Sequence, residues 1–385
     1  MEPGPRPEVS RGQERLAWLY ARLQRVTSSG RFDPAVDGLR FIAISWVVLF
    51  HIRSYVLDRG GFSADSLADA AIAHGHNGVQ LFFVISGFIL GSPFAARHLQ
   101  SQPAVDLRRF YLRRLTRLEP PYLVALIGCY LVLIIRPNVD HEGLTYGLLA
   151  SIPYLHALLA PETPWVNFVL WSLEIEVQFY LLAPLLSLVF AISRPSWRRA
   201  ILLGACFALA LGSGLMPLSR ATILAHGHYF IGGFLIADLR LSRSSSTPAH
   251  LLSALGVLAL AGMIAIERET SLLHELVFAA TTIIFVGATL NATWLRSVMS
   301  ARPLVAIGGM CYSIYLLHYP LISMVGRAAF RDLPQASYFT AYVCMALMTI
   351  PTVVVISTLF YLAIERPCMR PDWPQRFIAR VFAQR

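Results

Sequence analysis

Apolar residues gather in runs of helix length along the whole chain. A helix needs about 20 predominantly apolar residues to cross the hydrocarbon core of a bilayer. About ten runs approach that length, and they lie at 39–57, 77–92, 118–135, 169–192, 200–216, 222–239, 250–266, 275–291, 304–325 and 338–362. The pattern predicts an all-α, polytopic membrane protein with about ten transmembrane helices. The second and fifth runs are short, so we expect those two helices to be broken or tilted.

The composition supports this interpretation and excludes several classes of chemistry. Of the 385 residues, 56% are hydrophobic and 14% are charged, whereas about a quarter of the residues of a soluble domain are charged. All 32 basic residues are arginine, which excludes a P-loop lysine and lysine Schiff-base chemistry. No basic soluble module carries the net charge of +10, so we expect no nucleic-acid partner. The five cysteines have no C-x-x-C spacing, and we expect neither a disulfide framework nor a metal site.

The arginines also predict an orientation in the membrane. If the N-terminus is cytoplasmic, most arginines fall in cytoplasmic segments, as the positive-inside rule requires. We therefore expect a cytoplasmic arginine-rich segment at 1–37, a transmembrane domain at 38–366 and a short cytoplasmic tail at 367–385. The polar start predicts no cleavable signal peptide, and the tail is too short for an appended soluble domain. The outer loop at 137–168 has room for a short surface helix near 144–159.

Three ionisable residues fall inside predicted transmembrane helices, where burial of a charge is costly and usually functional. With a rise of about 1.5 Å per residue, His51 lies roughly 18 Å from the cytoplasmic end of its helix. The same count places Glu176 and His318 at roughly 20 and 21 Å. Three side chains on three helices therefore share one level, and Glu174 lies near it on another face. For His318 and Glu174 the alternative role is a polar residue that holds two helices together.

Arg40 and His51 share one helix face. Eleven steps of about 100° bring the second side chain to within about 20° of the first, roughly 16 Å further along the axis. One residue marks the cytoplasmic end of the helix and the other marks its middle. A long ligand with an anionic head could contact both, and acyl-CoA has this shape.

A second cluster of arginines follows at the start of the third predicted helix. Its members are Arg108, Arg109, Arg113, Arg114 and Arg117. The planar guanidinium can donate to two phosphate oxygens at once. The spacing of Arg113 and Arg117 puts both on one helix face. The cluster therefore indicates a phosphate site, although an orientation signal that contacts lipid headgroups explains it equally well.

These motifs together resemble the acyltransferase 3 family of integral-membrane acyltransferases. The resemblance covers most of the chain and depends on six segments in the family's order. They are 37–40 followed by His51, 78–88, 110–122, 171–180, 312–320 and 365–367. Each segment is modest alone, whereas six in order with matching spacing form a specific pattern.

The chain departs from this family in two positions. Many relatives have an aspartate where this chain has Gln80, and many have a second glutamate where it has Val177. An acid at position 80 therefore cannot be essential here, and Glu174 is a possible substitute for the missing glutamate. The His-Asp motif of soluble glycerolipid acyltransferases is absent, because Val56 stands five residues after His51.

The resemblance implies transfer of an acyl group, most simply acetyl, from acyl-CoA to a hydroxyl of a carbohydrate or glycosylated acceptor at a bacterial plasma membrane. His51 would be the general base, and Glu176 would orient its imidazole or bind the sugar. Cofactor-binding positions for the CoA phosphates would be Arg40, Arg113, Arg114 and Arg117. Substrate-binding positions would be Trp171, Ser172, Glu174, Gln178, Tyr180 and His318. Acyl-CoA is a co-substrate, and no tightly bound cofactor is expected.

Two alternatives remain at the level of sequence. A transporter or flippase would also place ionisable residues in mid-membrane, although the chain has no visible inverted repeat. Within the enzyme class, the acceptor could be a glycosylated secondary metabolite, and a covalent acyl-histidine could replace direct transfer. The depth count further predicts one cavity, which opens to the cytoplasm at Arg40 and reaches His51, Glu176 and His318.

Overall fold

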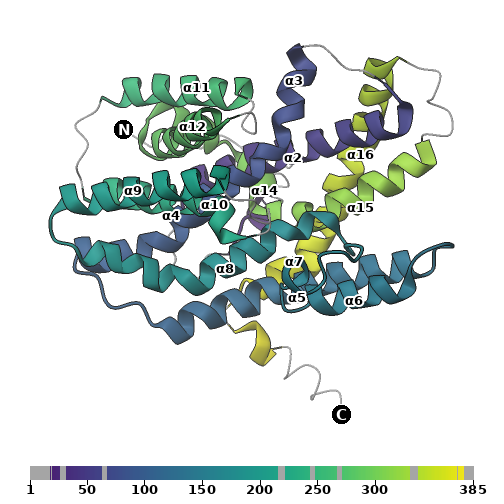
Figure 1. The fold of residues 1–385 in the computed structure, drawn as a ribbon, viewed down its shortest axis with the longest axis horizontal. Coiled ribbons are helices and arrows are strands. Elements are labelled where there is room, and N and C mark those ends of the chain that lie inside the picture. Colours follow the sequence, from purple (N-terminus) through teal and green to yellow (C-terminus); the bar gives the residue numbers. More distant parts are fainter. Residues whose placement is uncertain are drawn as a thin grey trace, which may run out of the picture.

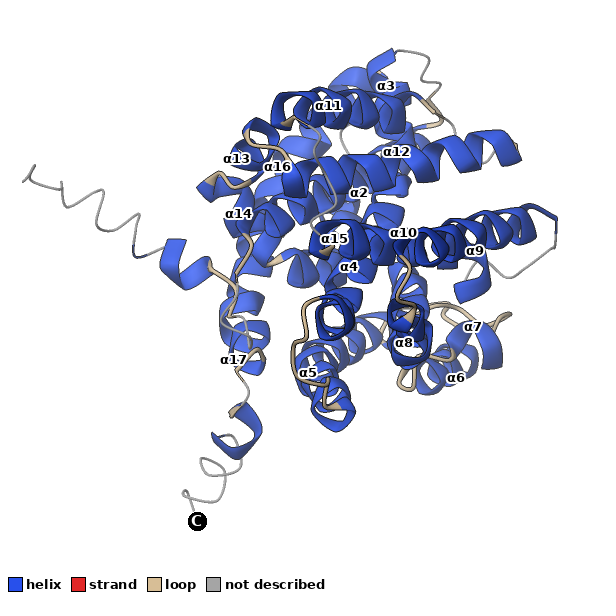
Figure 2. Ribbon diagram, turned by 90° about the vertical axis from the view of Figure 1, so that its left-hand side faces the viewer, coloured by secondary structure: helices blue, strands red, loops and turns tan. Residues whose placement is uncertain are grey.

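The computed structural model describes residues 18, 20–26, 32–62, 67–215, 222–242, 248–266, 271–329, 337–370 and 372–376. Within these ranges every regular element is a helix and there is no strand (Figures 1 and 2). The prediction of an all-α fold is therefore confirmed. Most of the predicted N-terminal segment and the end of the predicted tail lie outside the described residues.

Six stretches of the described chain are long and apolar enough to cross a membrane. They are α2 (Pro34–Gly60), Asp69–Leu99, α5 (Leu107–Ile134), Phe168–Ala191, α12 (Leu272–Asn291) and Tyr338–Cys368. The pair α14 (Arg302–Gly309) and α15 (Cys311–Ala329) adds a seventh if it counts as one span. The remaining predicted runs lie in α9 (Pro195–Leu215), α10 (Ile223–Leu241) and α11 (Ala249–Ala265). The protein is a polytopic membrane protein, and each of the ten runs is helical.

The run that is broken in the structure differs from the two runs that the sequence predicts to be broken or tilted. The ninth run is not one helix, because α14 and α15 meet at Met310 with a bend of 69°. The second run lies in α4 (Gly78–Leu99) and the fifth lies in α9, and both helices are longer than their apolar runs. Small and polar residues extend these two helices beyond the purely apolar positions. The break lies in the ninth run instead.

The other short elements connect these spans. Upstream of α4 lie α3 (Leu67–Ala73) and η1 (His74–Asn77). The loop after α5 forms α6 (His141–Ser151) and α7 (His156–Leu159), in agreement with the predicted surface helix. The span Phe168–Ala191 consists of η2 (Phe168–Leu170), α8 (Trp171–Leu186) and η3 (Ser187–Ala191). After α12 comes α13 (Trp294–Met299), and the last span consists of α16 (Tyr338–Phe360), η5 (Tyr361–Glu365) and α17 (Arg366–Cys368).

Helix α2 lies at the centre of the molecule (Figure 1) and contacts α4, α14, α15 and α16. Its start is fixed by Asp33, whose carboxylate accepts a hydrogen bond from the amide of Ala35, with Pro34 in the first turn. Such a cap satisfies one of the free amides at a helix start. The helix ends at Gly61, which has a φ of 62°, a left-handed conformation that glycine adopts at low cost.

Helices α4 and α10 pack with their backbones in close approach. A Cβ atom on Gly233 of α10 would lie 2.4 Å from the carbonyl oxygen of Val84 in α4. Small residues at a helix crossing are typical of membrane proteins, where van der Waals packing drives association. Around this crossing the rings of Phe83 and Phe179 each stack on the ring of Phe230. The α4–α10 pair is therefore closely packed.

A second close crossing holds α14 against α2. A Cβ atom on Gly308 would lie 1.7 Å from the carbonyl oxygen of Asp37. Next to it, a Cβ atom on Gly38 would lie 1.9 Å from the carbonyl oxygen of Met299, the last residue of α13. Both approaches are possible only without a side chain. This crossing fixes the first turn of α2, which carries Asp37 and Arg40.

Candidate active site

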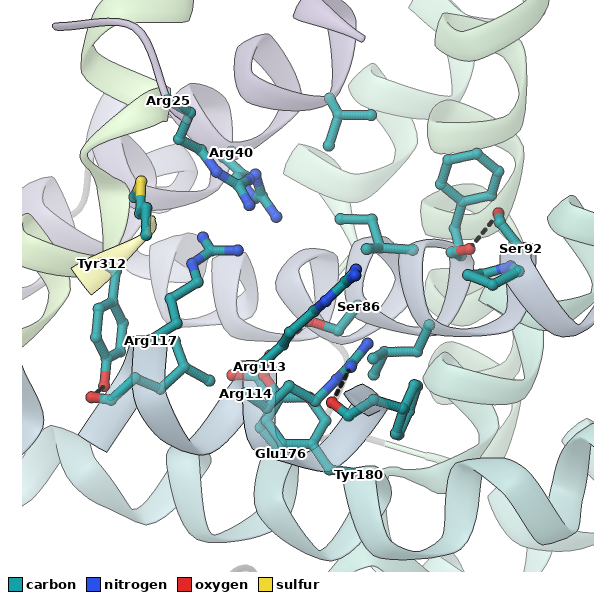
Figure 3. A pocket seen from close by; sticks show the side chains of 18 of the residues that line it. Arg25, Arg40, Ser86, Ser92, Arg113, Arg114, Arg117, Glu176, Tyr180 and Tyr312 are labelled. Atoms are coloured by element: carbon teal, nitrogen blue, oxygen red, sulfur yellow. Dashed lines mark hydrogen bonds between the residues drawn. The ribbon is translucent and has the colours of Figure 1, made fainter. Parts of the chain in front are cut away.

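A cavity of about 1110 Å³ opens between the first turns of α2 and α5 and is also lined by α4 and α8. Nine arginines contribute to its wall, namely Arg25, Arg40, Arg109, Arg113, Arg114, Arg117, Arg240, Arg296 and Arg370. Five carboxylates accompany them, namely Asp33, Asp37, Asp106, Glu176 and Glu365. The described wall therefore has an excess of four positive charges. In Figure 3, Arg25 and Arg40 face Arg113 and Arg117 across this space.

Arg40 is held in the wall by its own helix. Its Nη1 atom donates to Oδ1 of Asp37 at 2.7 Å, and Nη1 of Arg25 donates to the same oxygen at 3.4 Å. The carboxylate of Asp37 is 2% exposed, so it is a fixed acceptor that orients both guanidinium groups. The remaining N–H groups of the two arginines are available to a ligand.

The arginines of α5 occupy two different environments. Arg114 donates from Nη1 to the carbonyl oxygen of Phe110 at 2.7 Å and lies over the ring of Phe110, 3.5 Å from its centroid. Arg117 forms no ion pair with any described residue, and its Nε atom is buried without a hydrogen-bond partner. The carboxylate of Glu365 attracts Arg117 electrostatically but forms no ion pair with it. Arg117 therefore has hydrogen-bonding capacity left for an anionic ligand.

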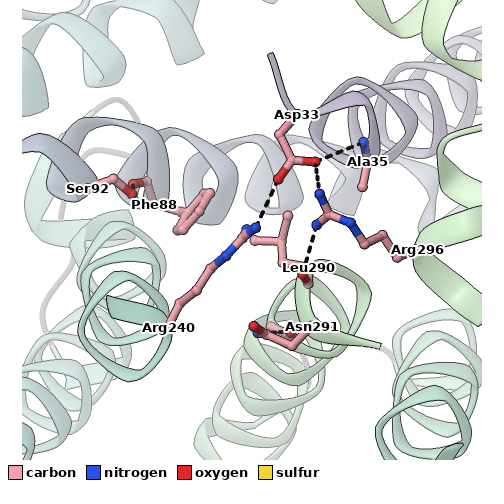
Figure 4. Close-up of polar contacts among 9 residues, drawn as sticks. Asp33, Ala35, Phe88, Ser92, Arg240, Leu290, Asn291 and Arg296 are labelled. Carbon is pink, nitrogen blue, oxygen red and sulfur yellow. Dashed lines mark hydrogen bonds and ion pairs between the residues drawn. The ribbon is translucent and has the colours of Figure 1, made fainter. Parts of the chain in front are cut away.

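Two further arginines of the wall already have a structural partner. Arg240 of α10 and Arg296 of α13 donate to the two oxygens of Asp33, at 3.1 and 2.9 Å (Figure 4). The Asp33 carboxylate thus joins two distant helices to the start of α2. These two guanidinium groups close the cavity on this side.

Glu176 lies in the cavity wall with Tyr180, as predicted, and both come from α8. Its Oε1 atom accepts hydrogen bonds from the hydroxyls of Ser86, at 2.8 Å, and Tyr180, at 2.5 Å. Ser172, also named from the sequence, lines the cavity and is 2.6 Å from the hydroxyl of Tyr315. One face of α8 thus supplies three of the predicted positions.

His51 and His318 lie next to each other, with ring centroids 5.2 Å apart. Neither residue lines the cavity. Tyr315 contacts both regions, because it lines the cavity and its ring centroid is 5.6 Å from that of His318. The structure therefore brings His51 together with His318 and brings Arg40 together with Glu176. Within the described residues, the cavity that contains Arg40 and Glu176 therefore does not extend to His51, in contrast to the expected single cavity.

Three other predicted substrate-binding residues lie outside the cavity wall. Trp171 contacts the ring of His226, with centroids 5.6 Å apart. The side-chain oxygen of Gln178 accepts a hydrogen bond from the amide of Ile223, the first residue of α10. Glu174 is buried, and its two oxygens accept hydrogen bonds from the amides of His156 and Ala157, at 2.7 and 3.0 Å. Their positions favour helix-to-helix contacts over substrate contact.

We expect the Glu174→Gln variant to lose stability and keep its substrate affinity. The amide side chain has a single acceptor oxygen, so one buried backbone N–H of α7 loses its partner, at a cost of about 1–3 kcal/mol. Thermal unfolding in detergent measures the loss of stability. An increase in the KM for the acceptor with unchanged stability would indicate that Glu174 contacts the substrate.

Sequence reasoning missed Arg25, Tyr315 and Glu365. Arg25 belongs to a polar segment without a helical pattern, so its charge is the only feature that indicates a function for it. Glu365 lies in the π-helical turn η5 and accepts hydrogen bonds from the amide and hydroxyl of Ser313. Such π-turns often occur at functional sites. The motif at 365–367 was the only sequence signal for this residue.

The fold and the cavity define a polytopic membrane protein with an arginine-rich cavity. The model of the acyltransferase 3 family, described as an acyltransferase domain, matches residues 33–358. The chain belongs to this family.

Curated relatives agree with this assignment. O-acetyltransferase OatA of Staphylococcus aureus strain NCTC 8325 is 26% identical over 367 residues, which cover 86% of this chain and 57% of the relative. OatA of strain COL matches equally. A further protein of strain COL, whose name also contains O-acetyltransferase, is 25% identical over 374 residues, 88% of this chain and 57% of that protein. The chain thus spans a little over half the length of these relatives. No solved structure matches it significantly.

Proposed function

We propose that the protein transfers an acyl group, most simply acetyl, from acyl-CoA to a hydroxyl of a carbohydrate or glycosylated acceptor. Membership of the acyltransferase 3 family supports acyl transfer. The distant relatives named O-acetyltransferase support acetyl as the group and oxygen as its destination. Orientation of the chain with its N-terminus in the cytoplasm, and residence in a bacterial plasma membrane, are part of this proposal.

The excess positive charge of the cavity is the main observation that supports acyl-CoA as the donor. Its described wall has nine arginines against five carboxylates. Coenzyme A carries a 3′-phosphate and a diphosphate, together roughly four negative charges near neutral pH, which equals the excess in the wall. Arg40, Arg113, Arg114 and Arg117 would bind these phosphates. Arg117 is the strongest candidate, because it has no ion-pair partner among the described residues.

The donor would enter the cavity with its phosphates against α2 and α5 and its acyl arm toward Tyr315. Ser172 and Tyr315 line the cavity and contact each other, and the ring of Tyr315 lies near His318 of the His51–His318 pair. Movement of the Tyr315 ring would therefore admit the thioester to His51. Glu176 is a fixed acceptor in the wall, and it would bind substrate N–H or O–H groups rather than orient the imidazole.

At the reaction centre His51 would act as the general base. Its imidazole removes the proton from the acceptor hydroxyl while the oxygen attacks the thioester carbonyl carbon. The carbon–sulfur bond breaks, and the imidazolium returns its proton to the CoA thiolate. The products are the O-acyl acceptor and CoA, and the histidine is regenerated.

The test is acetyl transfer by the purified protein in lipid nanodiscs, with labelled acetyl-CoA and a panel of membrane and surface glycans. We expect release of the CoA thiol together with a labelled glycan. Movement of a glycan across the bilayer without consumption of acetyl-CoA would favour a transporter or flippase. Failure to bind or consume any acyl-CoA would contradict the proposal.

We expect the Arg114→Lys variant to raise the KM for acyl-CoA about tenfold, with a smaller effect on the KM for the acceptor. Lysine keeps the charge but loses the planar fork that binds two oxygens, and it loses the contact with the Phe110 ring. The matched control is Arg108→Lys, because Arg108 is on the same helix, is exposed and does not line the cavity. Equal kinetics for the two variants would favour a role in lipid contact.

A further inference from the structure

His318 has a hydrogen-bonding pattern that fixes its tautomer. The residue is completely buried in α15. Its Nδ1 atom is 3.1 Å from the carbonyl oxygen of Ile314 and 2.8 Å from that of Tyr315. A carbonyl oxygen can only accept, so Nδ1 carries the hydrogen. A neutral imidazole protonated at Nδ1 has an uncovered lone pair at Nε2.

This lone pair has no partner. The Nε2 atom of His318 is buried and forms no hydrogen bond with any described residue. A buried acceptor without a donor costs free energy, and such a group in a native protein requires an explanation, of which a catalytic role is one. The neighbouring ring that can supply a donor is that of His51, whose centroid lies 5.2 Å away at an interplanar angle of 46°.

The surroundings of His51 limit how its ring can move. The ring of Tyr319 lies edge-on at 5.2 Å, and the ring of Phe50 lies edge-on at 5.1 Å. Within the described part of the chain, no hydrogen bond holds the imidazole of His51. At the observed separation, a rotation of His51 within this aromatic frame can bring one of its nitrogens to hydrogen-bonding distance of Nε2 of His318.

We propose that His318 is the positioning residue for His51 in acyl transfer. One nitrogen of His51 donates its hydrogen to Nε2 of His318. The other nitrogen of His51 then carries the lone pair and faces the acceptor hydroxyl. The partner of the base is therefore a neutral imidazole whose tautomer is set by the backbone of its own helix. This inference depends on the proposed function and assigns a role within it.

The pair would act in the same way throughout the transfer step. The proton of the acceptor hydroxyl moves to the free nitrogen of His51 as the oxygen attacks the thioester carbon. His51 is then an imidazolium, and its other N–H remains bonded to the lone pair of His318, which spreads the charge. When the carbon–sulfur bond breaks, the sulfur takes the proton. His318 remains neutral and gains or loses no proton.

Two substitutions of His318 distinguish a role in positioning His51 from a role in packing. His318→Phe keeps a ring of similar size but has no acceptor, whereas His318→Gln keeps an acceptor at the end of the side chain. We expect His318→Phe to lower kcat by about 10- to 100-fold, the range seen when a partner that orients a functional group is removed. The KM for acyl-CoA should stay unchanged, because His318 does not line the cavity. His318→Gln should recover a substantial part of kcat.

The control is His156→Phe, which removes another completely buried histidine, in α7. That variant should keep kcat. A wild-type protein that transfers acyl groups, with His318→Phe equal to it in kcat, would overturn the positioning role and leave the proposed function intact. A wild-type protein that uses no acyl-CoA would overturn both.

A spectroscopic readout tests the pair without turnover. In protein labelled with ¹⁵N-histidine, the signals of His51 are assigned from the His51→Ala variant and those of His318 from His318→Gln. We expect His318 protonated at Nδ1, and we expect the proton-bearing nitrogen of His51 to change its shift in His318→Phe. An unchanged His51 signal, or a fixed water as the only partner of Nε2, would show that His318 serves packing alone.

Discussion

Replacement of His51 by alanine is expected to lower kcat for acyl transfer by about 10²- to 10⁴-fold, the usual contribution of a positioned general base. The side chain contacts Phe50, His318 and Tyr319 only through its ring, and it is partly exposed. Expression and thermal stability should therefore stay close to those of the wild type. The measurement is the initial rate of product formation from acetyl-CoA by purified variant and wild-type protein at equal concentration.

The matched control is His76→Ala. His76 also contacts the ring of Phe50, with centroids 5.2 Å apart, so it tests loss of a neighbouring imidazole without loss of the base. Mass spectrometry of protein quenched during turnover separates direct transfer from a covalent acyl-histidine. A His51→Ala protein that is well folded and retains more than a small fraction of wild-type activity would falsify the catalytic assignment.

Gly308→Ala is expected to cause the largest loss of stability, about 3 kcal/mol, which is the upper end of the usual range for an overpacked contact. The new Cβ atom would lie 1.7 Å from the carbonyl oxygen of Asp37, and neither backbone can move without separating α14 from α2. The same displacement would disturb the Asp37 carboxylate that holds Arg25 and Arg40. Denaturation in detergent measures the loss.

Gly128→Ala is the control for this substitution, because a Cβ atom at that position of α5 has no neighbour within 4 Å. Alanine is also the better helix former at an interior position, so this variant should unfold at the wild-type temperature or above it. Equal stability of Gly308→Ala and Gly128→Ala would mean that the α2–α14 crossing is much looser than described.

The helices could be predicted well from the sequence, because membrane insertion requires long apolar runs and such runs are visible. The bend between α14 and α15 could not be predicted in the same way. Hydropathy continues without interruption through Gly308, Gly309 and Met310, so the ninth run read as one span. Next to the bend, Gly308 lies in close contact with α2, and a tertiary contact of this kind is not visible in the hydropathy.

The depth of the candidate site residues in the membrane could be predicted from the sequence. The neighbours that their side chains face could not. A count of residues along a helix gives depth in the membrane, and His51 and His318 indeed lie side by side. The same count put Glu176 with them, but the face of α8 that carries Glu176 is turned toward Ser86 and the arginine cavity. Which face of a helix meets which neighbour is set by packing, and a single sequence does not contain that information directly.

The position of Tyr315 at the cavity wall has a consequence for ion leakage across the membrane. A continuous water path from the arginine cavity to His51 would conduct protons and small ions down the membrane potential, which is worth about 2.3 kcal/mol per charge at 100 mV. The buried hydroxyl of Tyr315 is hydrogen-bonded to Ser172 and to the carbonyl oxygen of Val169, and neither His51 nor His318 lines the cavity. Under the proposed function, a donor that enters by displacing this ring would itself fill the opening. Acyl transfer at His51 would then proceed without electrical leakage.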